Sequence, residues 1–269
     1  MTEFSAPKAI DKSNLFRKGD PDFMTSLARG IEVIRAFSDT KTGVNMSAIS
    51  ERTGLSRAVA RRCLYTLSEM GYVRRDLDGY YLEPKILSLS QTYFSSTSLP
   101  ALAQEHLDHV KESTGESCSL AILDEHETVY IARSAARRIM AVSLGIGSRL
   151  PAYCTSLGRV LLAALPPAEL DNYFGTIKRK AFTERTRTTQ RDLKAIIDKT
   201  REQGFTIVDQ ELEIGLRSLA VPVRNHNGVV VAAMNVGVQA SRVSLSDLKR
   251  QTLPVLLSAS EKLRSQLIC

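Results

Sequence analysis

Residues 46–70 constrain the fold of the N-terminal part of the chain most strongly, because two helical patterns meet there at a tight turn. The shorter pattern begins at Met46 and ends at Gly54, and the longer one runs from Arg57 to Met70. Ser56 stands directly before the longer pattern, where its hydroxyl can accept a backbone N–H as an N-cap. The spacing therefore predicts two helices joined by a short turn.

The flanking residues complete a small domain. Apolar residues recur at three- and four-residue steps from about Thr25 to Phe37, which predicts a preceding helix. After Gly71, which is suited to a left-handed C-cap, two strand-like runs at 72–75 and 80–82 flank an Asp-Gly-containing turn and predict a hairpin. Three helices followed by a hairpin describe a winged helix-turn-helix.

The helix expected at 57–70 has two distinct faces when its residues are placed about 100° apart. One face is apolar and is expected to pack on the preceding helices. An ordinary surface helix with solvated arginines is the alternative, but the turn, the cap and the hairpin in register with this helix argue against it. The polar face consists of Arg57, Ala58, Arg61, Arg62, Tyr65, Ser68 and Glu69.

This polar face has the chemistry of a helix that reads the major groove of DNA. Arginine pairs bidentately with guanine edges or holds phosphates, and the first residues of such a helix reach furthest into the groove. Arginines of the hairpin, with Lys85 after it, would contact flanking phosphates and add affinity without specificity. The predicted DNA-binding residues are Ser56, Arg57, Ala58, Arg61, Arg62, Tyr65, Arg74 and Arg75.

Charge, apolar stretches and cysteine spacing limit the classes of protein that this chain can belong to. The net charge of +7 is spread over both halves of the chain, so it gives little support for a DNA partner. The longest apolar stretch, Val229–Val238, contains Asn235 and is far shorter than the roughly 20 residues of a membrane-spanning helix. Four cysteines without a C-x-x-C pair and an N-terminus without a secretion signal lead us to expect reduced thiols and a cytoplasmic protein.

Changes in pattern divide the chain into segments. Residues 1–22 show no sustained period and are expected to form a flexible arm. The winged helix-turn-helix is predicted over 23–83, and a linker, helical in part, over 84–100. Residues 101–269 alternate helical runs (102–110, 155–165, 193–203, 244–267) with strand-like runs (119–123, 128–132, 140–144, 205–208, 219–223, 229–236). This alternation predicts an α/β or α+β domain.

An enzyme is the main alternative class, and the candidate catalytic groups do not favour it. Asp209, Glu211 and Glu213 alternate as they would on one face of a strand, but no histidine lies near them in the sequence. His106 and His109 are one helical step apart, a spacing that can chelate a metal but is more often part of a solvated helix face. We expect no catalysis, no cofactor and no metal.

Longer motifs carry a family resemblance. The sequence resembles IclR-type transcriptional regulators in the runs FMTSLARGIEVIRAF (23–37), ISERTGLSRA (49–58) and MGYV (70–73) of the first half, and in GSRLPAYCTSLGR (147–159) and GLRSLA (215–220) of the second. The resemblance covers about residues 23–267. Within the family, runs such as LPAYCTS are similar to the branch that controls the β-ketoadipate pathway and responds to protocatechuate, 4-hydroxybenzoate or β-ketoadipate.

The resemblance implies an α+β chain, in which an N-terminal winged helix-turn-helix domain is joined by a helical linker to a GAF-like α/β effector domain. Many relatives have a histidine where Tyr153 stands and a small residue where Leu157 stands, so this chain departs from the pattern at both positions. Family pockets use the positions that match Val142, Leu150, Ser156, Leu157, Asp209, Ser218, Asn235 and Gly237.

The residues themselves favour a polar pocket in the same region. The free backbone N–H groups at the start of the helix at 155–158 suit a carboxylate. Ser218 and Asn235 interrupt apolar strands, so they are either hydrogen-bonded core residues or ligand contacts. Arg149 or Arg217 is a candidate partner for an acidic effector, and the alternative for each is an ordinary ion pair.

The combined prediction is a ligand-responsive regulator of aromatic-acid catabolism. It would bind double-stranded operator DNA as a homodimer or homotetramer, and a small aromatic or dicarboxylic acid would shift its DNA-binding geometry through the segment 84–100. No membrane partner is expected. The alternative is a DNA-binding regulator whose second domain serves only oligomerisation and has no effector.

Overall fold

The computed structural model describes residues 20–37, 43–136 and 144–267. The chain divides between Thr97 and Ser98 into two compact units. The effector position Val142 and all but the last residue of the strand expected at 140–144 lie outside the described residues. None of the helices in the described ranges is long and apolar enough to span a membrane.

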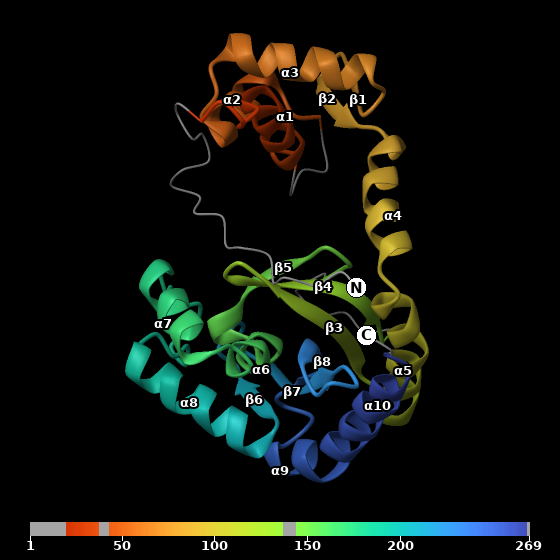
Figure 1. Ribbon diagram of the computed structural model, residues 1–269, viewed down its shortest axis with the longest axis vertical. Helices are drawn as coiled ribbons and strands as arrows, with labels where there is room; N and C mark the ends of the chain where they lie inside the picture. The colour runs from red at the N-terminus through yellow and green to blue at the C-terminus, as the bar shows by residue number, and fades with distance from the viewer. Residues whose placement is uncertain (1–19, 38–42, 137–143, 268–269) are drawn as a thin grey trace. The chain divides into compact units, whose positions relative to one another are not determined.

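The N-terminal unit packs three helices around one small core and adds a hairpin (Figure 1). Val33, Ile49 and Leu64, one from each helix, are fully buried together. The turn between the second and third helices is tight because Gly54 adopts a φ of +68°, which glycine reaches without strain. The elements are α1 (Thr25–Arg35), α2 (Met46–Thr53), α3 (Arg57–Glu69), β1 (Val73–Asp76), β2 (Gly79–Leu82), η2 (Pro84–Ile86) and α4 (Leu87–Ser96).

The C-terminal unit is built on one antiparallel sheet of six strands in the order β5-β4-β3-β8-β7-β6. The strands are β3 (Ser117–Asp124), β4 (Glu127–Ser134), β5 (Arg149–Pro151), β6 (Thr206–Asp209), β7 (Leu216–Arg224) and β8 (Val230–Gln239). The helices are α5 (Leu99–Thr114), η3 (Ala152–Cys154), α6 (Ser156–Ala163), α7 (Pro167–Thr176), α8 (Gln190–Gln203), α9 (Leu245–Asp247), η4 (Leu248–Thr252) and α10 (Leu253–Gln266).

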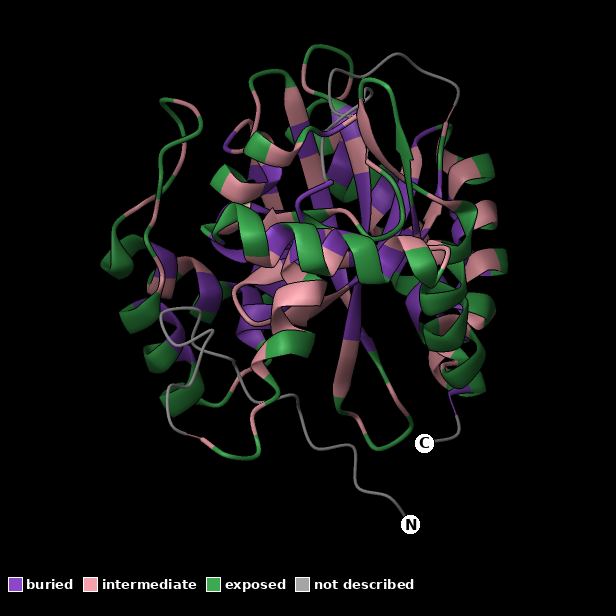
Figure 2. Ribbon diagram, turned by 90° about the horizontal axis from the view of Figure 1, so that it is seen from above, coloured by how far each residue is buried: buried purple, intermediate pink, exposed green. Residues whose placement is uncertain are grey.

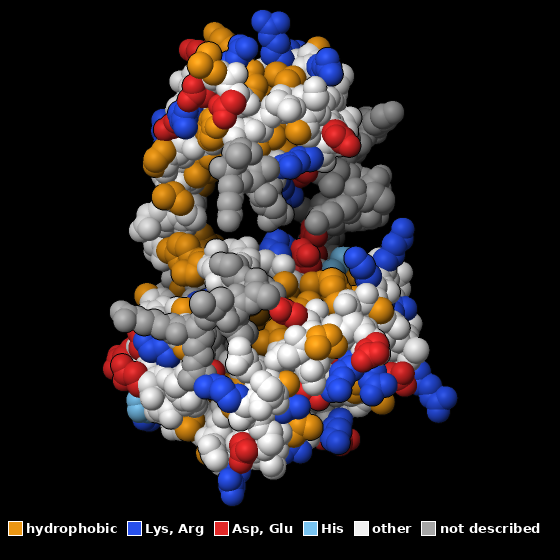
Figure 3. Space-filling view, turned by 180° about the vertical axis from the view of Figure 1, so that it is seen from behind, with side chains coloured by type: hydrophobic (Ala, Val, Ile, Leu, Met, Phe, Trp, Pro, Cys, Tyr) orange, Lys and Arg blue, Asp and Glu red, His pale blue; other side chains and the backbone are white. Residues whose placement is uncertain are grey.

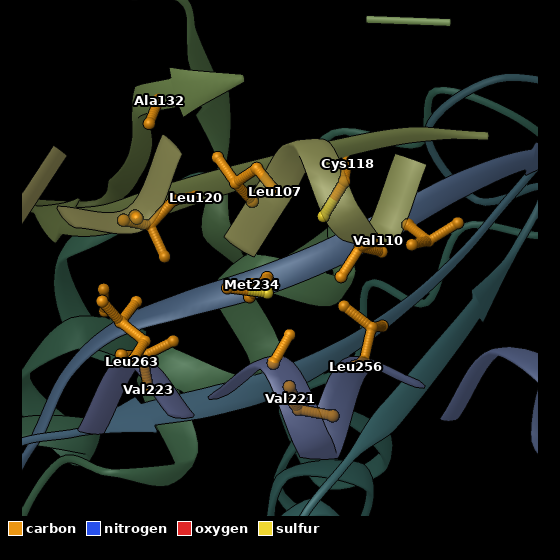
Figure 4. Packing of buried hydrophobic residues seen from close by; sticks show 14 of the residues in the cluster. Leu107, Val110, Cys118, Leu120, Ala132, Val221, Val223, Met234, Leu256 and Leu263 are labelled. Atoms are coloured by element: carbon orange, nitrogen blue, oxygen red, sulfur yellow. The ribbon is translucent and has the colours of Figure 1, made fainter. Parts of the chain in front are cut away.

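Helices cover both faces of the sheet, which is therefore the middle of three layers. Successive side chains of a strand point to opposite faces, so each strand packs against both helical layers. On one face, Leu120 and Met234 pack against α5 and α10, which lie side by side (Figures 1 and 4). On the other face, Ala121 and Ala233 lie under α6, with α8 packed outside it. The helices turn exposed residues outward while buried residues gather on the strands (Figure 2). This unit is therefore an α/β domain, as expected.

The start of α6 is held against the preceding 3-10 turn η3 by Gly158. A Cβ atom at this position would lie 2.1 Å from the carbonyl oxygen of Ala152, far inside van der Waals contact. The Thr155 hydroxyl also accepts a hydrogen bond from the Gly158 N–H at 3.2 Å and caps the helix. Close approach and the cap together fix where the first turn of α6 lies.

The long helix expected at 244–267 is interrupted in the structure. A π-helical turn, η4, separates the short α9 from α10, and Pro254 stands in the first turn of α10. Proline has no N–H to continue the regular helical bonding, which accounts for a wider turn just before it. The elements expected from the sequence did not include β5, a strand of three residues, or α7, a helix that begins at Pro167.

Candidate functional site

The outer face of α3 carries the side chains that the sequence predicts to contact DNA. Ser56, Arg57, Ala58, Arg61, Arg62 and Tyr65 are all exposed, and Tyr65 retains 67% of its surface. Lys and Arg side chains stand out at the end of this unit that carries α3 (Figure 3). The Ser56 hydroxyl accepts a hydrogen bond from the Val59 N–H at 3.5 Å, so Ser56 acts as the N-cap of the helix.

The arginines of α3 differ in how freely their guanidinium groups can reach a partner. Arg57 donates a hydrogen bond to the Ser47 hydroxyl of α2 at 3.1 Å. Arg61 and Arg62 form no ion pair with any described residue. A guanidinium without a carboxylate partner can bind a phosphate or a guanine edge without first breaking an ion pair.

The two arginines of the hairpin are also unequal. Arg74 pairs with Asp76 at 2.6 Å and with Glu83 at 3.1 Å. Arg75 has no ion pair among the described residues, and its guanidinium lies over the ring of Tyr80. Lys85 donates a hydrogen bond to the Met70 carbonyl at 2.8 Å and so holds the end of α3. Arg75 is therefore the hairpin cation best placed to meet a phosphate.

A cavity in the C-terminal unit lies on the α6 face of the sheet, at the N-terminal end of α6. Its floor is a row of small polar residues that strand register brings together. Ser117 pairs across the sheet with Gly237, and Gly237 pairs with Ser218 on the next strand. Ser119 pairs with Asn235 in the adjacent row. All five line the cavity, because period-two alternation puts them on the face opposite α5 and α10.

The wall of the cavity combines carbon surface with a few polar groups. Tyr130 lies in the wall, and burial raises its pKa to about 12, so its phenol stays protonated at neutral pH. The Cys154 thiol is buried there as well, and burial raises its pKa to about 12. A thiol that is so rarely ionised is a poor nucleophile. The apolar side chains of the wall are Leu144, Leu150, Val208, Leu212 and Leu216.

Two polar groups of the cavity have hydrogen-bonding capacity left over. The Ser156 hydroxyl is buried and has no hydrogen-bond partner within the described ranges. Arg133 lies in the wall and donates one hydrogen bond, from Nη1 to the Ser119 hydroxyl at 3.2 Å, but pairs with no described carboxylate. A hydroxyl and a guanidinium that line the same cavity supply groups that can bind a carboxylate.

Asp209, Arg149 and Arg217, which the sequence pointed to, already have charged partners. Asp209 accepts a hydrogen bond from the Arg217 Nε at 2.8 Å and pairs with Arg185, and the Arg217 bond holds the pKa of Asp209 below its usual value. Arg149 pairs with Asp124 at 2.7 Å and with Glu127 at 2.8 Å. Neither Arg149 nor Arg217 lines the cavity.

Comparison with known proteins decides the family. Residues 26–77 match the IclR helix-turn-helix domain, and residues 91–264 match the bacterial transcriptional regulator IclR C-terminal domain. The chain belongs to the IclR family. It is 48% identical to the Pca regulon regulatory protein of Pseudomonas putida, in a match that covers 93% of this chain and 86% of that protein. It is 34% identical over 91% of its length to 92% of the p-hydroxybenzoate hydroxylase transcriptional activator of Acinetobacter baylyi.

A solved IclR-type domain resembles the C-terminal unit. This is the inducer-binding domain of a double mutant of the PobR transcription factor from Acinetobacter, in complex with 3-hydroxybenzoic acid. It is 34% identical and has a TM-score of 0.58, and the match covers 61% of this chain and 97% of that chain. The predicted resemblance to IclR regulators of the β-ketoadipate branch is thereby confirmed, and so is the predicted fold.

The positions carried over from IclR regulators divide into three groups in the structure. Asp209 lies outside the cavity in its ion pairs, and Leu157 is fully buried between α6 and the sheet. Val142 is outside the described residues. The cavity brings together the other five, which are Leu150, Ser156, Ser218, Asn235 and Gly237.

In this IclR regulator the sequence did not single out Arg133, and two expectations were wrong, one for the acidic run at 209–213 and one for His106. Arg133 pairs with Ser119 across β3 and β4. A register shift in this strand pair places Arg133 and Tyr130, three positions apart, on the same cavity, so regular alternation along the strand does not indicate the face of Arg133. Gln210 adopts a φ of +62°, so Glu211 and Glu213 follow a turn and do not share a strand face with Asp209. His106 is buried and lies 3.2 Å from the Gln266 Oε1, so it does not belong to a solvated face.

The relatives of this chain are transcriptional regulators.

Within the described ranges, no group of three or more metal-ligating side chains is close enough to hold a metal ion.

Proposed function

We propose that this IclR-family protein binds operator DNA through α3 and the hairpin, and that a small aromatic acid bound in the C-terminal cavity changes that binding. The gene products under its control would serve aromatic-acid catabolism, because its relatives include a Pca regulon regulator and a p-hydroxybenzoate hydroxylase activator. DNA contacts are assigned to the exposed residues Ser56, Arg57, Ala58, Arg61, Arg62, Tyr65, Arg74 and Arg75.

The observation that carries the ligand half of this proposal is that one cavity is lined by a hydroxyl without a hydrogen-bond partner, that of Ser156, and by a guanidinium without a carboxylate partner, that of Arg133. Arg133 would pair with the carboxylate, and the buried Ser156 hydroxyl would donate to it or to a ring hydroxyl. A buried polar group without a partner is costly, so a ligand that satisfies it is favoured over an empty cavity. The leucines of the wall suit the ring.

A second copy of the chain is part of the proposal. Met24, Leu27 and Ile31 form a stripe along one side of α1, and they retain 66%, 60% and 45% of their surfaces. An apolar stripe at helical spacing on a small domain suits the same stripe of another copy. Two α3 helices related by a two-fold axis would then read a palindromic or repeated operator.

Fluorescence anisotropy on DNA from upstream of the protein's own gene tests this function. The titration is run with and without protocatechuate, 4-hydroxybenzoate and β-ketoadipate, at two stated salt concentrations. We expect a saturable, salt-dependent complex whose affinity changes with one of these acids. A complex whose affinity for DNA changes with none of the three acids would contradict the proposed class of ligand. A scan of DNA upstream of genes for aromatic-acid breakdown would follow if the first fragment does not bind.

The rival function is a regulator whose C-terminal unit only joins copies of the chain. It predicts the same DNA complex with no response to any small acid. The polar floor of the cavity argues against this rival, because a surface used only for association has no need of an unsatisfied hydroxyl inside the domain.

A further inference from the structure

A second cavity lies at the other end of α6. The first cavity meets the helix at Thr155 and Ser156, whereas the second meets it at Val160, Ala163 and Ala164. Its volume is about 460 Å³, which is within the roughly 300–1,000 Å³ typical of small-molecule sites. The C-terminal end of α8 and the turn between β7 and β8 supply the other walls.

The lining of this second cavity is mostly carbon with a positive edge. Side chains of Val160, Leu165, Pro222 and Val230 contribute to its walls, and no acidic residue among those that the structure describes lines it. Val229 stands at the turn with 58% of its surface exposed. An apolar residue left this exposed beside a cavity is available to contact a ligand.

Two arginines provide the positive charge, and only one of them is already neutralised. Arg201 pairs with Asp198 at 2.8 Å and donates to the Ala163 carbonyl at 2.9 Å. Arg224 donates one hydrogen bond to the Gly228 carbonyl at 2.8 Å and has no carboxylate partner among the residues that the structure describes.

The backbone around Arg224 supports a positioned side chain. The register between β7 and β8 shifts between Val223 and Arg224. Such a bulge turns the side chain next to it out of the regular alternation, and bulges of this kind are common beside binding sites. The turn itself is fixed, because Val229 and Asn225 exchange hydrogen bonds, from the Val229 N–H to the Asn225 Oδ1 and from the Asn225 N–H to the Val229 carbonyl.

We propose that this cavity is a second site for a small apolar carboxylate, with Arg224 as the partner of the carboxylate group and the carbon walls around its hydrocarbon part. The charge of the lining selects an anion, and the carbon surface selects one with an aromatic or branched aliphatic body. This site shares no lining residue with the cavity that holds Arg133.

The two sites share one rigid element. All eight residues of α6 are buried, and Gly158 fixes the first turn of the helix against Ala152. A ligand that shifts one end of such a helix also shifts the wall of the other cavity. Occupancy of the second site should therefore change ligand affinity at the first, and the reverse change must be equal by linkage. This coupling rests on the proposed function; binding at the second site does not.

Fluorine NMR of 4-fluorobenzoate with the full-length protein tests the site. We expect two bound signals, one for each cavity. Arg224→Gln should weaken the binding that gives one signal at least about tenfold, and it should change the other only through the coupling. Arg133→Gln should weaken the binding that gives the other signal by about tenfold or more. Arg250→Gln is the matched control, since it removes one positive charge from an exposed residue that lines neither cavity.

A cavity-filling pair gives a second reading of the same signal. Ala164 is exposed and lines the second cavity, so Ala164→Phe should block it, whereas Ala168→Phe on α7 should not. A single bound signal that responds only to Arg133→Gln would overturn the second site. Two signals that both ignore Arg224→Gln and Ala164→Phe would overturn it as well. A bound signal that responds to Arg224→Gln, with no signal that responds to Arg133→Gln, would support the second site and contradict binding in the first cavity.

Discussion

Arg159 and Glu211 form a buried, two-pronged ion pair, with Nη1–Oε1 and Nη2–Oε2 distances of 2.7 Å each. The side chains keep 2% and 9% of their surfaces. Arg159 also donates from Nε to the Tyr153 carbonyl, and Glu211 also accepts the Arg187 N–H. One charge pair thus ties α6, the turn before it and the segment after β6 into a single unit.

Glu211→Gln should destabilise the C-terminal unit by about 3–5 kcal/mol, because it leaves the buried Arg159 charge without a counter-charge. Urea unfolding followed by circular dichroism measures the change. Glu261→Gln is the control, since the Arg264–Glu261 pair is exposed and its loss should cost under about 1 kcal/mol. Equal effects of the two substitutions would show that the buried pair has no special role.

Gly158→Ala should also destabilise this unit, by about 1–3 kcal/mol or more, because the new Cβ would lie 2.1 Å from a backbone oxygen that cannot move aside freely. Gly175→Ala is the matched control. Nothing lies within 4 Å of a Cβ built at Gly175, near the end of α7, so this change should stabilise by about 0.4–1 kcal/mol. Thermal unfolding of both variants measures the two changes. An unchanged melting temperature for Gly158→Ala would contradict the close approach to Ala152.

Asp209 should contribute to stability in a pH-dependent way. Its pKa is lowered, first of all by the hydrogen bond from Arg217, so the folded state favours the carboxylate. That contribution is present above the ordinary aspartate pKa of about 3.9 and is lost as the pH falls through the lower pKa of the folded protein. Unfolding midpoints of wild type and Asp209→Asn should differ at pH 7, begin to converge as the pH falls below about 3.9, and coincide only below the lowered pKa of the folded protein. A constant difference would contradict the assignment.

Arg61→Ala should weaken operator binding by about 1–3 kcal/mol if the guanidinium reads a base. Anisotropy on the operator and on a scrambled duplex of the same length separates the two possible roles. A larger loss on the operator assigns Arg61 to base recognition. Equal loss on both duplexes, with a shallower salt dependence, would assign it to a phosphate.

Arg133→Gln should weaken binding of the aromatic acid about tenfold or more, because a hydrogen bond between two charged groups contributes roughly 1.5–3 kcal/mol. Calorimetric titration of the full-length protein measures it. Arg149→Gln is the matched control, since Arg149 is held by Asp124 and Glu127 outside the cavity and should leave the affinity unchanged. Loss of affinity in the Arg149 variant alone would show that Arg149, and not Arg133, binds the carboxylate.

Local signals in the sequence were sufficient for the DNA-binding unit. Gly54, Ser56 and Gly71 take the turn and cap conformations that their positions imply, and α3 spans 57–69 where 57–70 was expected. These features depend on residues a few positions apart, which a single sequence displays directly. β5 is only three residues long and shows no periodicity. α7 was missed although Pro167 opens it and Leu170, Tyr173 and Phe174 recur at helical spacing.

The ligand cavity was harder to anticipate because its residues meet through strand register. Ser117, Gly237 and Ser218 come from three strands, and only their pairing places them side by side. Arg133 could not be preferred over Arg149 or Arg217 until the ion pairs of those two were known. Charge pairing over long sequence separations has no local pattern, and this is where the sequence analysis erred.

Met234 and Asn235 are neighbours in the chain and face opposite sides of the same strand, one in the hydrophobic core and one in the cavity proposed for the ligand. On the proposed function, selection for folding and selection for ligand choice would act on alternate positions of β8 and β7. Substitutions at 218, 235 or 237 would then change which acid is bound, while the residues between them keep the domain folded. The choice of effector would evolve separately from the stability of the domain.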